Sequence, residues 1–232
     1  MQLTIVNGSP RSGKSNSGLL IELLMPLIKE KNEVTIIHVE SFKSADNNVD
    51  EIVKADILVL AFPLYVDSIP SHILYLMERI SENHRNNNLI IYVIMNNGFY
   101  EGKQNHIAIQ QMKLWCYDNG FVWGQGIGCG AGEMLPFLKK VPLGHGPNKN
   151  LGDALEVFAT NINRQNSGED LYINPNWPRF IWRHQANRMY WIPKAKKNGL
   201  KRRIFLRNKL YISITKKLLQ FNILCFTQYD IV

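Results

Sequence analysis

The sequence has few cysteines and no long hydrophobic run. Its 232 residues include Cys116, Cys129 and Cys225, and no two of them form a C-x-x-C pair. This spacing gives no support to a zinc knot or an iron–sulfur cluster, and scattered thiols are typical of a reducing compartment. No run of about 18 apolar residues occurs, and the first residues lack the basic start of a signal peptide. We therefore expect no spanning helix and a cytoplasmic location.

Acidic residues are almost absent from the last quarter of the chain. Residues 171–232 contain 13 lysines and arginines but a single acid, Asp230, whereas residues 1–170 contain 14 basic and 18 acidic residues. The net charge of +8 therefore combines a mildly acidic body with a strongly basic tail. We predict a globular domain over residues 1–170 and a basic, mainly helical C-terminal extension over residues 171–232.

Apolar runs of strand length alternate with segments of helical periodicity in the body. The predicted strands are residues 3–6, 33–39, 56–62, 89–95 and 121–127, and the predicted helices are residues 19–27, 49–54, 69–82, 105–117 and 151–162. A polar connection is expected over residues 41–48. Strands and helices that alternate five times predict an α/β fold with a parallel sheet.

Residues 7–17, which join the first strand to the first helix, are small, polar or basic. A strand, a short loop and a helix N-terminus together aim backbone N–H groups and the positive end of the helix dipole at one point, where an anion can bind. Four serines add hydroxyl donors, and Arg11 and Lys14 add positive charge. The stretch therefore predicts a phosphate site.

This loop is compatible with two kinds of phosphate site. Residues 8–15 match the nucleotide-binding pattern G-x-x-x-x-G-K-[ST]. Such a P-loop requires an acid that holds Mg²⁺ at the end of a neighbouring strand. The third predicted strand ends at Phe62 and Pro63 without one, and Glu40 after the second strand is the best remaining candidate. A P-loop nucleotide-binding protein is thus the less favoured alternative.

Three further loops follow predicted strands, over residues 63–70, 96–101 and 126–132. In parallel sheets, ligands bind at this carboxyl edge. The loops contain glycines, which let a flat ring approach the backbone, and aromatic residues, which can stack on it. The set suits a planar heterocycle attached to a phosphate.

In order and spacing these loops resemble those of the flavodoxin-like NAD(P)H-dependent FMN reductases. The resemblance covers residues 1–165 and rests on Gly8-Ser-Pro-Arg11 with Ser15-Asn-Ser17, on Pro63-Leu-Tyr-Val-Asp-Ser-Ile-Pro70, and on Asn97-Gly-Phe-Tyr-Glu101. It implies a flavodoxin-like three-layer sandwich with a five-stranded parallel sheet in the order 2-1-3-4-5. It also implies bound FMN, NADPH or NADH as co-substrate, and often a homodimer. Lys14 departs from the commoner small or polar residue at its position.

The resemblance also implies which residues hold the cofactor. The phosphate would be held by Ser9, Arg11, Ser15, Asn16 and Ser17. The ring would be bordered by Pro63, Leu64, Tyr65 and Val66 on one side and by Asn97, Gly98, Phe99 and Tyr100 on the other. We name no catalytic side chain and no metal ligand, because in flavin enzymes the cofactor carries the hydride chemistry.

The expected function is an oxidoreductase that transfers hydride from NAD(P)H, through bound flavin, to a small acceptor: a quinone, a nitro- or azo-aromatic, or flavin. The alternative is an electron carrier of flavodoxin type, which should expose an acidic docking face around the ring. The loops near the ring carry only Asp67, Glu101 and Glu133, which favours the enzyme.

The basic tail has three candidate partners. Residues 180–191 interleave aromatic and basic side chains, residues 194–203 form a basic cluster, and residues 206–218 show an imperfect amphipathic helical pattern. In decreasing order of preference, the tail packs on the acidic body or a dimer mate, lies on an anionic membrane surface, or binds nucleic acid. A membrane-peripheral location is therefore the alternative to a purely cytoplasmic one.

Overall fold

The computed structural model describes residues 2–28, 33–83 and 88–199. The chain divides into two compact units, Met1–Asn176 and Trp177–Val232. The first unit thus includes residues 171–176, which the charge pattern alone would place in the extension.

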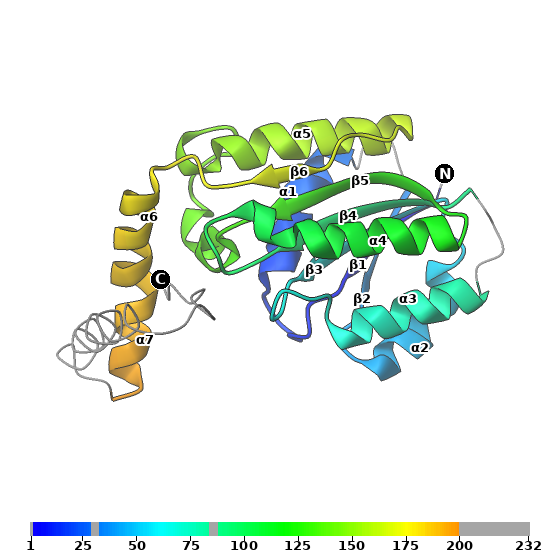
Figure 1. Cartoon of the computed structure of the whole chain (residues 1–232), viewed down its shortest axis with the longest axis horizontal. Helices are drawn as coiled ribbons and strands as arrows, with labels where there is room; N and C mark the ends of the chain where they lie inside the picture. The colour runs from blue at the N-terminus through cyan, green and yellow to red at the C-terminus, as the bar shows by residue number, and fades with distance from the viewer. Residues whose placement is uncertain (1, 29–32, 84–87, 200–232) are drawn as a thin grey trace, which may run out of the picture. The chain divides into compact units, whose positions relative to one another are not determined.

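The first unit is built on a parallel sheet (Figure 1). Its strands are β1 (Gln2–Asn7), β2 (Glu33–His38), β3 (Ile57–Pro63), β4 (Ile90–Asn96), β5 (Val122–Cys129) and β6 (Leu171–Ile173). They lie in the order β2-β1-β3-β4-β5-β6, which confirms the predicted order 2-1-3-4-5. The expectation of five strands is wrong by one, because β6 pairs in parallel with the last three residues of β5.

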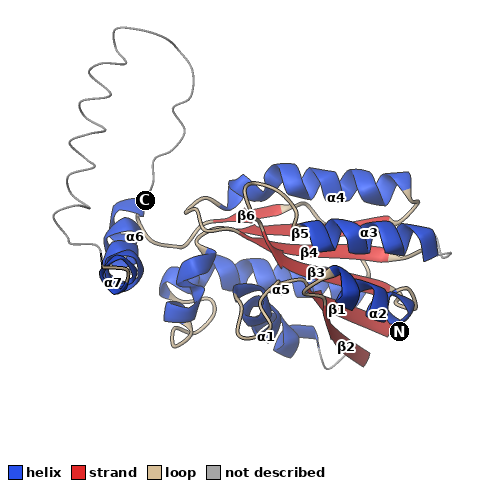
Figure 2. Ribbon diagram, turned by 90° about the horizontal axis from the view of Figure 1, so that it is seen from below, coloured by secondary structure: helices blue, strands red, loops and turns tan. Residues whose placement is uncertain are grey.

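Helices cover both faces of this sheet, so the three-layer sandwich is confirmed. They are α1 (Asn16–Ile28), α2 (Phe42–Ile52), α3 (Ser71–Asn83), α4 (His106–Asp118) and α5 (Lys149–Arg164), with short 3₁₀ helices η1 (Gly102–Asn105), η2 (Gly132–Leu138) and η3 (Gly146–Asn148). One core cluster contains residues of α1 and α5, and the other contains residues of α2, α3 and α4. Figure 2 shows the sheet between these two layers.

The central strand β3 illustrates why the sequence folds in this way. Leu58, Leu60 and Phe62 belong to one core, and Ile57 and Val59 belong to the other. Successive side chains of a strand point to opposite faces, so a strand that is covered on both faces must be apolar throughout. The uninterrupted apolar run of residues 57–62 follows from this requirement.

Helix α2 is longer than expected. The predicted polar connection over residues 41–48 is wrong, because the helix already begins at Phe42. Ser41 is its N-cap: its side chain accepts a hydrogen bond from the backbone N–H of Ser44, and the Ser44 side chain accepts one from the backbone N–H of Ser41. This capping box satisfies two N–H groups that a helix N-terminus otherwise leaves unpaired.

In the second unit the structure describes residues 177–199, which are mainly helical as expected. They form α6 (Arg179–Ala186), a π-helical turn η4 (Asn187–Trp191) and α7 (Ile192–Lys197). The amphipathic pattern over residues 206–218 lies outside the described residues. Among the helices that the structure describes, none is long and apolar enough to cross a membrane.

Candidate functional site

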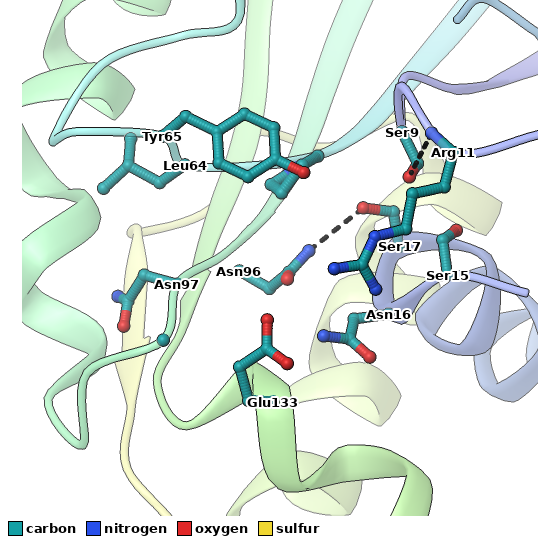
Figure 3. Close-up of a pocket in the computed structure, with 12 residues that line it drawn as sticks. Ser9, Arg11, Ser15, Asn16, Ser17, Leu64, Tyr65, Asn96, Asn97 and Glu133 are labelled. Carbon is teal, nitrogen blue, oxygen red and sulfur yellow. Dashed lines mark hydrogen bonds between the residues drawn. The ribbon is translucent and has the colours of Figure 1, made fainter. Parts of the chain in front are cut away.

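A cleft opens at the carboxyl ends of β1, β3 and β4 (Figure 3). It contains about 380 Å³ of empty space, part of which is open solvent. The chain continues from β1 to β2 on one side and returns to β3 on the other, so this is the switch point at which such sheets bind ligands. The lining residues are Ser9, Arg11, Ser15, Asn16, Ser17, Pro63, Leu64, Tyr65, Asn96, Asn97, Gly98 and Glu133.

Most of the predicted site residues therefore meet in one place. The residues predicted at the phosphate all line the cleft, as do Pro63, Leu64, Tyr65, Asn97 and Gly98. Val66, Phe99 and Tyr100 do not line it. Two lining residues, Asn96 and Glu133, are absent from the predicted set.

The loop between β1 and α1 leaves several hydrogen-bond donors free at the N-terminus of a helix. Ser15 caps α1, since its Oγ accepts a hydrogen bond from the N–H of Gly18 at 3.0 Å. The Oγ of Ser9 accepts one from the N–H of Arg11 at 3.3 Å. Within the described part of the chain, the backbone N–H groups of residues 12–17 have no acceptor. Unpaired N–H groups at the positive end of a helix dipole are well suited to bind a phosphate.

Asn96 connects this loop to the middle of the cleft. Its Nδ2 lies 3.0 Å from the Oγ of Ser17 and 3.4 Å from the carbonyl oxygen of Phe62, and the residue is buried. Because the Ser17 oxygen accepts from Asn96, its own hydroxyl hydrogen can be donated to a ligand. Asn96 thus fixes the orientation of a residue predicted at the phosphate.

The loop after β3 forms a tight turn at the rim of the cleft. Tyr65 and Ser68 exchange two backbone hydrogen bonds of 3.1 and 3.0 Å. The residues between them, Val66 and Asp67, have φ angles of 50° and 56°, as in the two-residue turns that favour asparagine and glycine. Val66 is 99% exposed, so the turn directs it away from the position beside the ring that the resemblance implies. A β-branched residue is unfavourable in this backbone region.

The loops after β4 and β5 are held together. The Oδ1 of Asn97 accepts a hydrogen bond from the N–H of Phe99 at 2.8 Å, so its amide shapes the loop. The backbone N–H of Ala131 donates to the carbonyl of Phe99, and that of Gly132 donates to the carbonyl of Asn97 at 2.7 Å. A Cβ atom at Gly98 would meet only the Cγ of Glu133, at 3.8 Å. The loop therefore offers a wall of bare backbone to the cleft.

Tyr100 contacts the segment after β6 and does not line the cleft. Its hydroxyl donates to the carbonyl of Pro175 at 3.3 Å, and the Oδ1 of Asn174 accepts from the N–H of Gly102 at 2.8 Å. The segment after β6 thus anchors the loop that follows β4. A Cβ atom at Gly130 would collide with the Tyr100 carbonyl oxygen, so this close approach requires glycine.

Glu133 is the acidic residue of the cleft lining. It lies in the first turn of η2, just after Ala131, whose φ is 59°. Figure 3 shows its carboxylate pointing into the cleft between Asn97 and Asn16. Glu133 has no ion pair or hydrogen bond among the described residues. The sequence signal was an acid just after a glycine-rich loop, but nothing in the pattern indicated that the turn would direct it inward.

Three other residues that could have had a functional role, Cys129, His72 and Lys14, do not line the cleft. Burial raises the pKa of the Cys129 thiol to about 12, so it stays protonated and is a poor nucleophile. The ring of His72, on α3, donates from Nε2 to the carbonyl oxygen of Gly8 at 3.0 Å and so supports the loop between β1 and α1. Lys14 is exposed and does not line the cleft. The described residues hold no group of three His, Cys, Asp or Glu side chains that could bind a metal ion.

Comparisons with known proteins agree with this architecture. A family model described as flavodoxin-like fold matches residues 1–109. The structure of an NADH:FMN oxidoreductase in its apo form is similar, with a TM-score of 0.55 and 13% identity over 72% of this chain and 91% of that one. A short-chain flavodoxin associated with a bacterial microcompartment matches with a TM-score of 0.52 and 14% identity over 72% and 99% of the two chains. The Trp repressor binding protein of Bacillus subtilis matches with a TM-score of 0.50 and 17% identity, over 67% of this chain and 99% of that one. No curated protein matches the sequence. At these identities the similarity establishes the fold alone.

Proposed function

This chain has a flavodoxin-like fold, and from that premise we propose that it is an FMN-dependent oxidoreductase that uses NADPH or NADH to reduce a small acceptor. The acceptor classes we propose are quinones, nitro- and azo-aromatics, and flavins. The observation that carries the proposal is the composition of one cleft, which combines an anion-binding loop with an apolar and aromatic wall. A ligand made of a phosphate joined to a planar ring requires this combination.

The phosphate end of the cleft fits FMN. The backbone N–H groups of residues 12–17 have no acceptor among the described residues, and the Arg11 side chain adds a positive charge. Ser17 can donate its hydroxyl hydrogen because Asn96 already occupies its oxygen as an acceptor. A phosphate monoester supplies oxygens for all of these donors.

The other end fits a flat ring. Leu64 is 8% exposed and gives an apolar contact, while Tyr65 is 44% exposed and its ring faces the cleft in Figure 3. Gly98, which also lines the cleft, presents backbone without a side chain. Apolar, aromatic and bare-backbone surfaces let a planar ring approach closely.

The protein's own part in the reaction is then binding and orientation. FMN would supply the hydride chemistry, and we assign no side chain as an acid–base catalyst for it. Arg11 and Ser17 hold the phosphate, while Leu64, Tyr65 and Gly98 exclude water from the ring. Glu133 lies between the phosphate end and the ring end of the cleft. There its carboxylate can accept hydrogen bonds from the hydroxyl groups on the carbon chain that links the phosphate of FMN to its ring.

A pair of variants with equal charge changes tests this assignment. Arg11→Gln removes a cation that lines the cleft, whereas Lys14→Gln removes one that is exposed and outside it. A hydrogen bond to a charged group contributes about 1.5–3 kcal/mol, so Arg11→Gln should weaken FMN binding at least tenfold. Riboflavin, which lacks the phosphate, should bind both variants and the unaltered protein equally.

The same two variants also test whether the loop is a P-loop that binds a nucleotide. A P-loop depends on its lysine for the β- and γ-phosphates of ATP. If Lys14→Gln abolishes tight ATP binding while FMN does not bind, the proposal is wrong. If Arg11→Gln weakens FMN and riboflavin to the same extent, the phosphate is not bound at this loop.

A further inference from the structure

We propose that the basic unit after residue 176 binds the surface of an anionic phospholipid bilayer. The proposal rests on the charge and the exposed apolar side chains of this unit and is independent of the chemistry in the cleft.

The side-chain charges in the described part of this unit are all positive. The described residues 177–199 contain no acid, and their lysines and arginines are Arg179, Arg183, Arg188, Lys194, Lys196 and Lys197. The structure pairs none of the three lysines with a carboxylate of the described residues. Each lysine or arginine near an anionic leaflet contributes about 1 kcal/mol of attraction.

The same helical stretch exposes large apolar side chains. Phe180 is 71% exposed, Met189 is 43% exposed, and Ile181 and Trp191 are each 36% exposed. These residues alternate with the basic ones along α6, η4 and α7. Helices that lie in a membrane interface use lysine and arginine for the headgroups and large apolar side chains for the acyl boundary, and this segment exposes both kinds.

Around η4, aromatic rings and a lysine form a local cluster. The rings of Tyr190 and Trp191 meet edge to face with centroids 5.1 Å apart. The Lys194 ammonium lies 5.0 Å from the Tyr190 centroid and 5.8 Å from that of Trp191. Tyrosine, tryptophan and lysine each combine an apolar body with a polar end, which suits the boundary between acyl chains and headgroups.

A bilayer accounts for more of these features than nucleic acid does. Nucleic acid would use the cations for phosphates and the aromatic rings for stacking. It gives no role to the exposed aliphatic side chains of Ile181 and Met189. An anionic bilayer binds the cations at its headgroups and accepts both kinds of apolar side chain below them.

Vesicle sedimentation with the full chain tests the proposal. The chain should sediment with phosphatidylglycerol-containing vesicles at low ionic strength, and much less with phosphatidylcholine vesicles or at high ionic strength. Lys194→Gln, Lys196→Gln and Lys197→Gln together should weaken binding on the order of a hundredfold. The matched control makes the same change at Lys43, Lys103 and Lys140, exposed lysines of the first unit, and should bind as the unaltered chain does.

A second variant separates a bilayer from nucleic acid. Phe180→Ser with Met189→Ser removes exposed apolar surface without changing charge and should weaken vesicle binding several-fold. A chain that ignores anionic vesicles, or that loses as much binding in the Lys43, Lys103 and Lys140 control, overturns the proposal. So does a chain that binds a single-stranded DNA oligonucleotide more tightly than vesicles, with the serine variant unchanged in both assays.

Discussion

Asn96 at the end of β4 donates a hydrogen bond of 3.0 Å to the hydroxyl of Ser17 in the first turn of α1. The two residues are 79 positions apart in the chain, and their contact joins the start of α1 to the end of β4. Ligand affinity should therefore depend on a side chain that need not touch the ligand itself.

Replacement of Asn96 tests this dependence. Asn96→Ala leaves the Ser17 hydroxyl without its donor and free to rotate, and one net hydrogen bond contributes about 0.5–1.5 kcal/mol. We expect FMN affinity to fall up to about tenfold in fluorescence titration, with riboflavin affinity less affected. Asn47→Ala, at an exposed position on α2, is the control. Unchanged FMN affinity in Asn96→Ala would show that Ser17 needs no orientation.

Glu133 should act on the part of the ligand that FMN and riboflavin share. If its carboxylate accepts hydrogen bonds from the hydroxyl groups that both ligands carry, Glu133→Gln should weaken the binding of both by a similar factor, about tenfold. If it acts only as a negative charge near the phosphate, the same variant strengthens FMN alone. Titration of both ligands into Glu133→Gln, with the exposed Glu156→Gln as control, separates the two results.

His72 should make stability depend on pH. Burial lowers the pKa of this imidazole below its usual 6.5, against the opposing effect of its hydrogen bonds to the backbone of Gly8 and Val39. Between the two pKa values the unfolded chain binds a proton that the folded chain does not, so stability is lost as pH falls below 6.5. Urea unfolding from roughly pH 7.5 to pH 5 should therefore show a shallower loss for His72→Gln than for the unaltered chain.

The exposed His145 supplies the control for this experiment. His145→Gln should keep the pH dependence of the unaltered chain. If His72→Gln keeps it as well, protonation of His72 does not oppose folding.

The turn at Val66 offers a gain in stability. Asparagine tolerates positive φ better than a β-branched residue, so Val66→Asn should stabilise the chain by about 1 kcal/mol. Val157→Asn, an exposed change within α5, should give no such gain. Because Val66 does not line the cleft, FMN affinity should not change. A loss of affinity in Val66→Asn would place this residue against the ligand, as the sequence resemblance implies.

The fold was largely predictable from the sequence because the buried strands are apolar on both faces. The start of α2 was missed because few of its residues are buried, so the apolar pattern is weak there and the capping box at Ser41 and Ser44 was the better signal. Strand β6 has three residues, too few for a periodic pattern, and only its pairing with β5 defines it.

The candidate site was predictable where a motif and a strand end coincide. Residues of the loop between β1 and α1 line the cleft together with Leu64 and Tyr65, and their binding of a cofactor stays a prediction. Asn96 and Asn97 are adjacent asparagines, and the sequence does not reveal that both reach the cleft. Glu133 reaches it through the left-handed turn at Ala131, which the sequence pattern does not show.

The most direct test of the central claim is the visible absorbance of the protein after reconstitution with FMN, followed anaerobically as NADPH and then NADH are added. We predict a bound flavin whose absorption band is bleached by at least one of the two nucleotides. A bound flavin that only dithionite bleaches would instead indicate an electron carrier of flavodoxin type. A protein that binds no flavin and is stabilised by ATP would contradict the account.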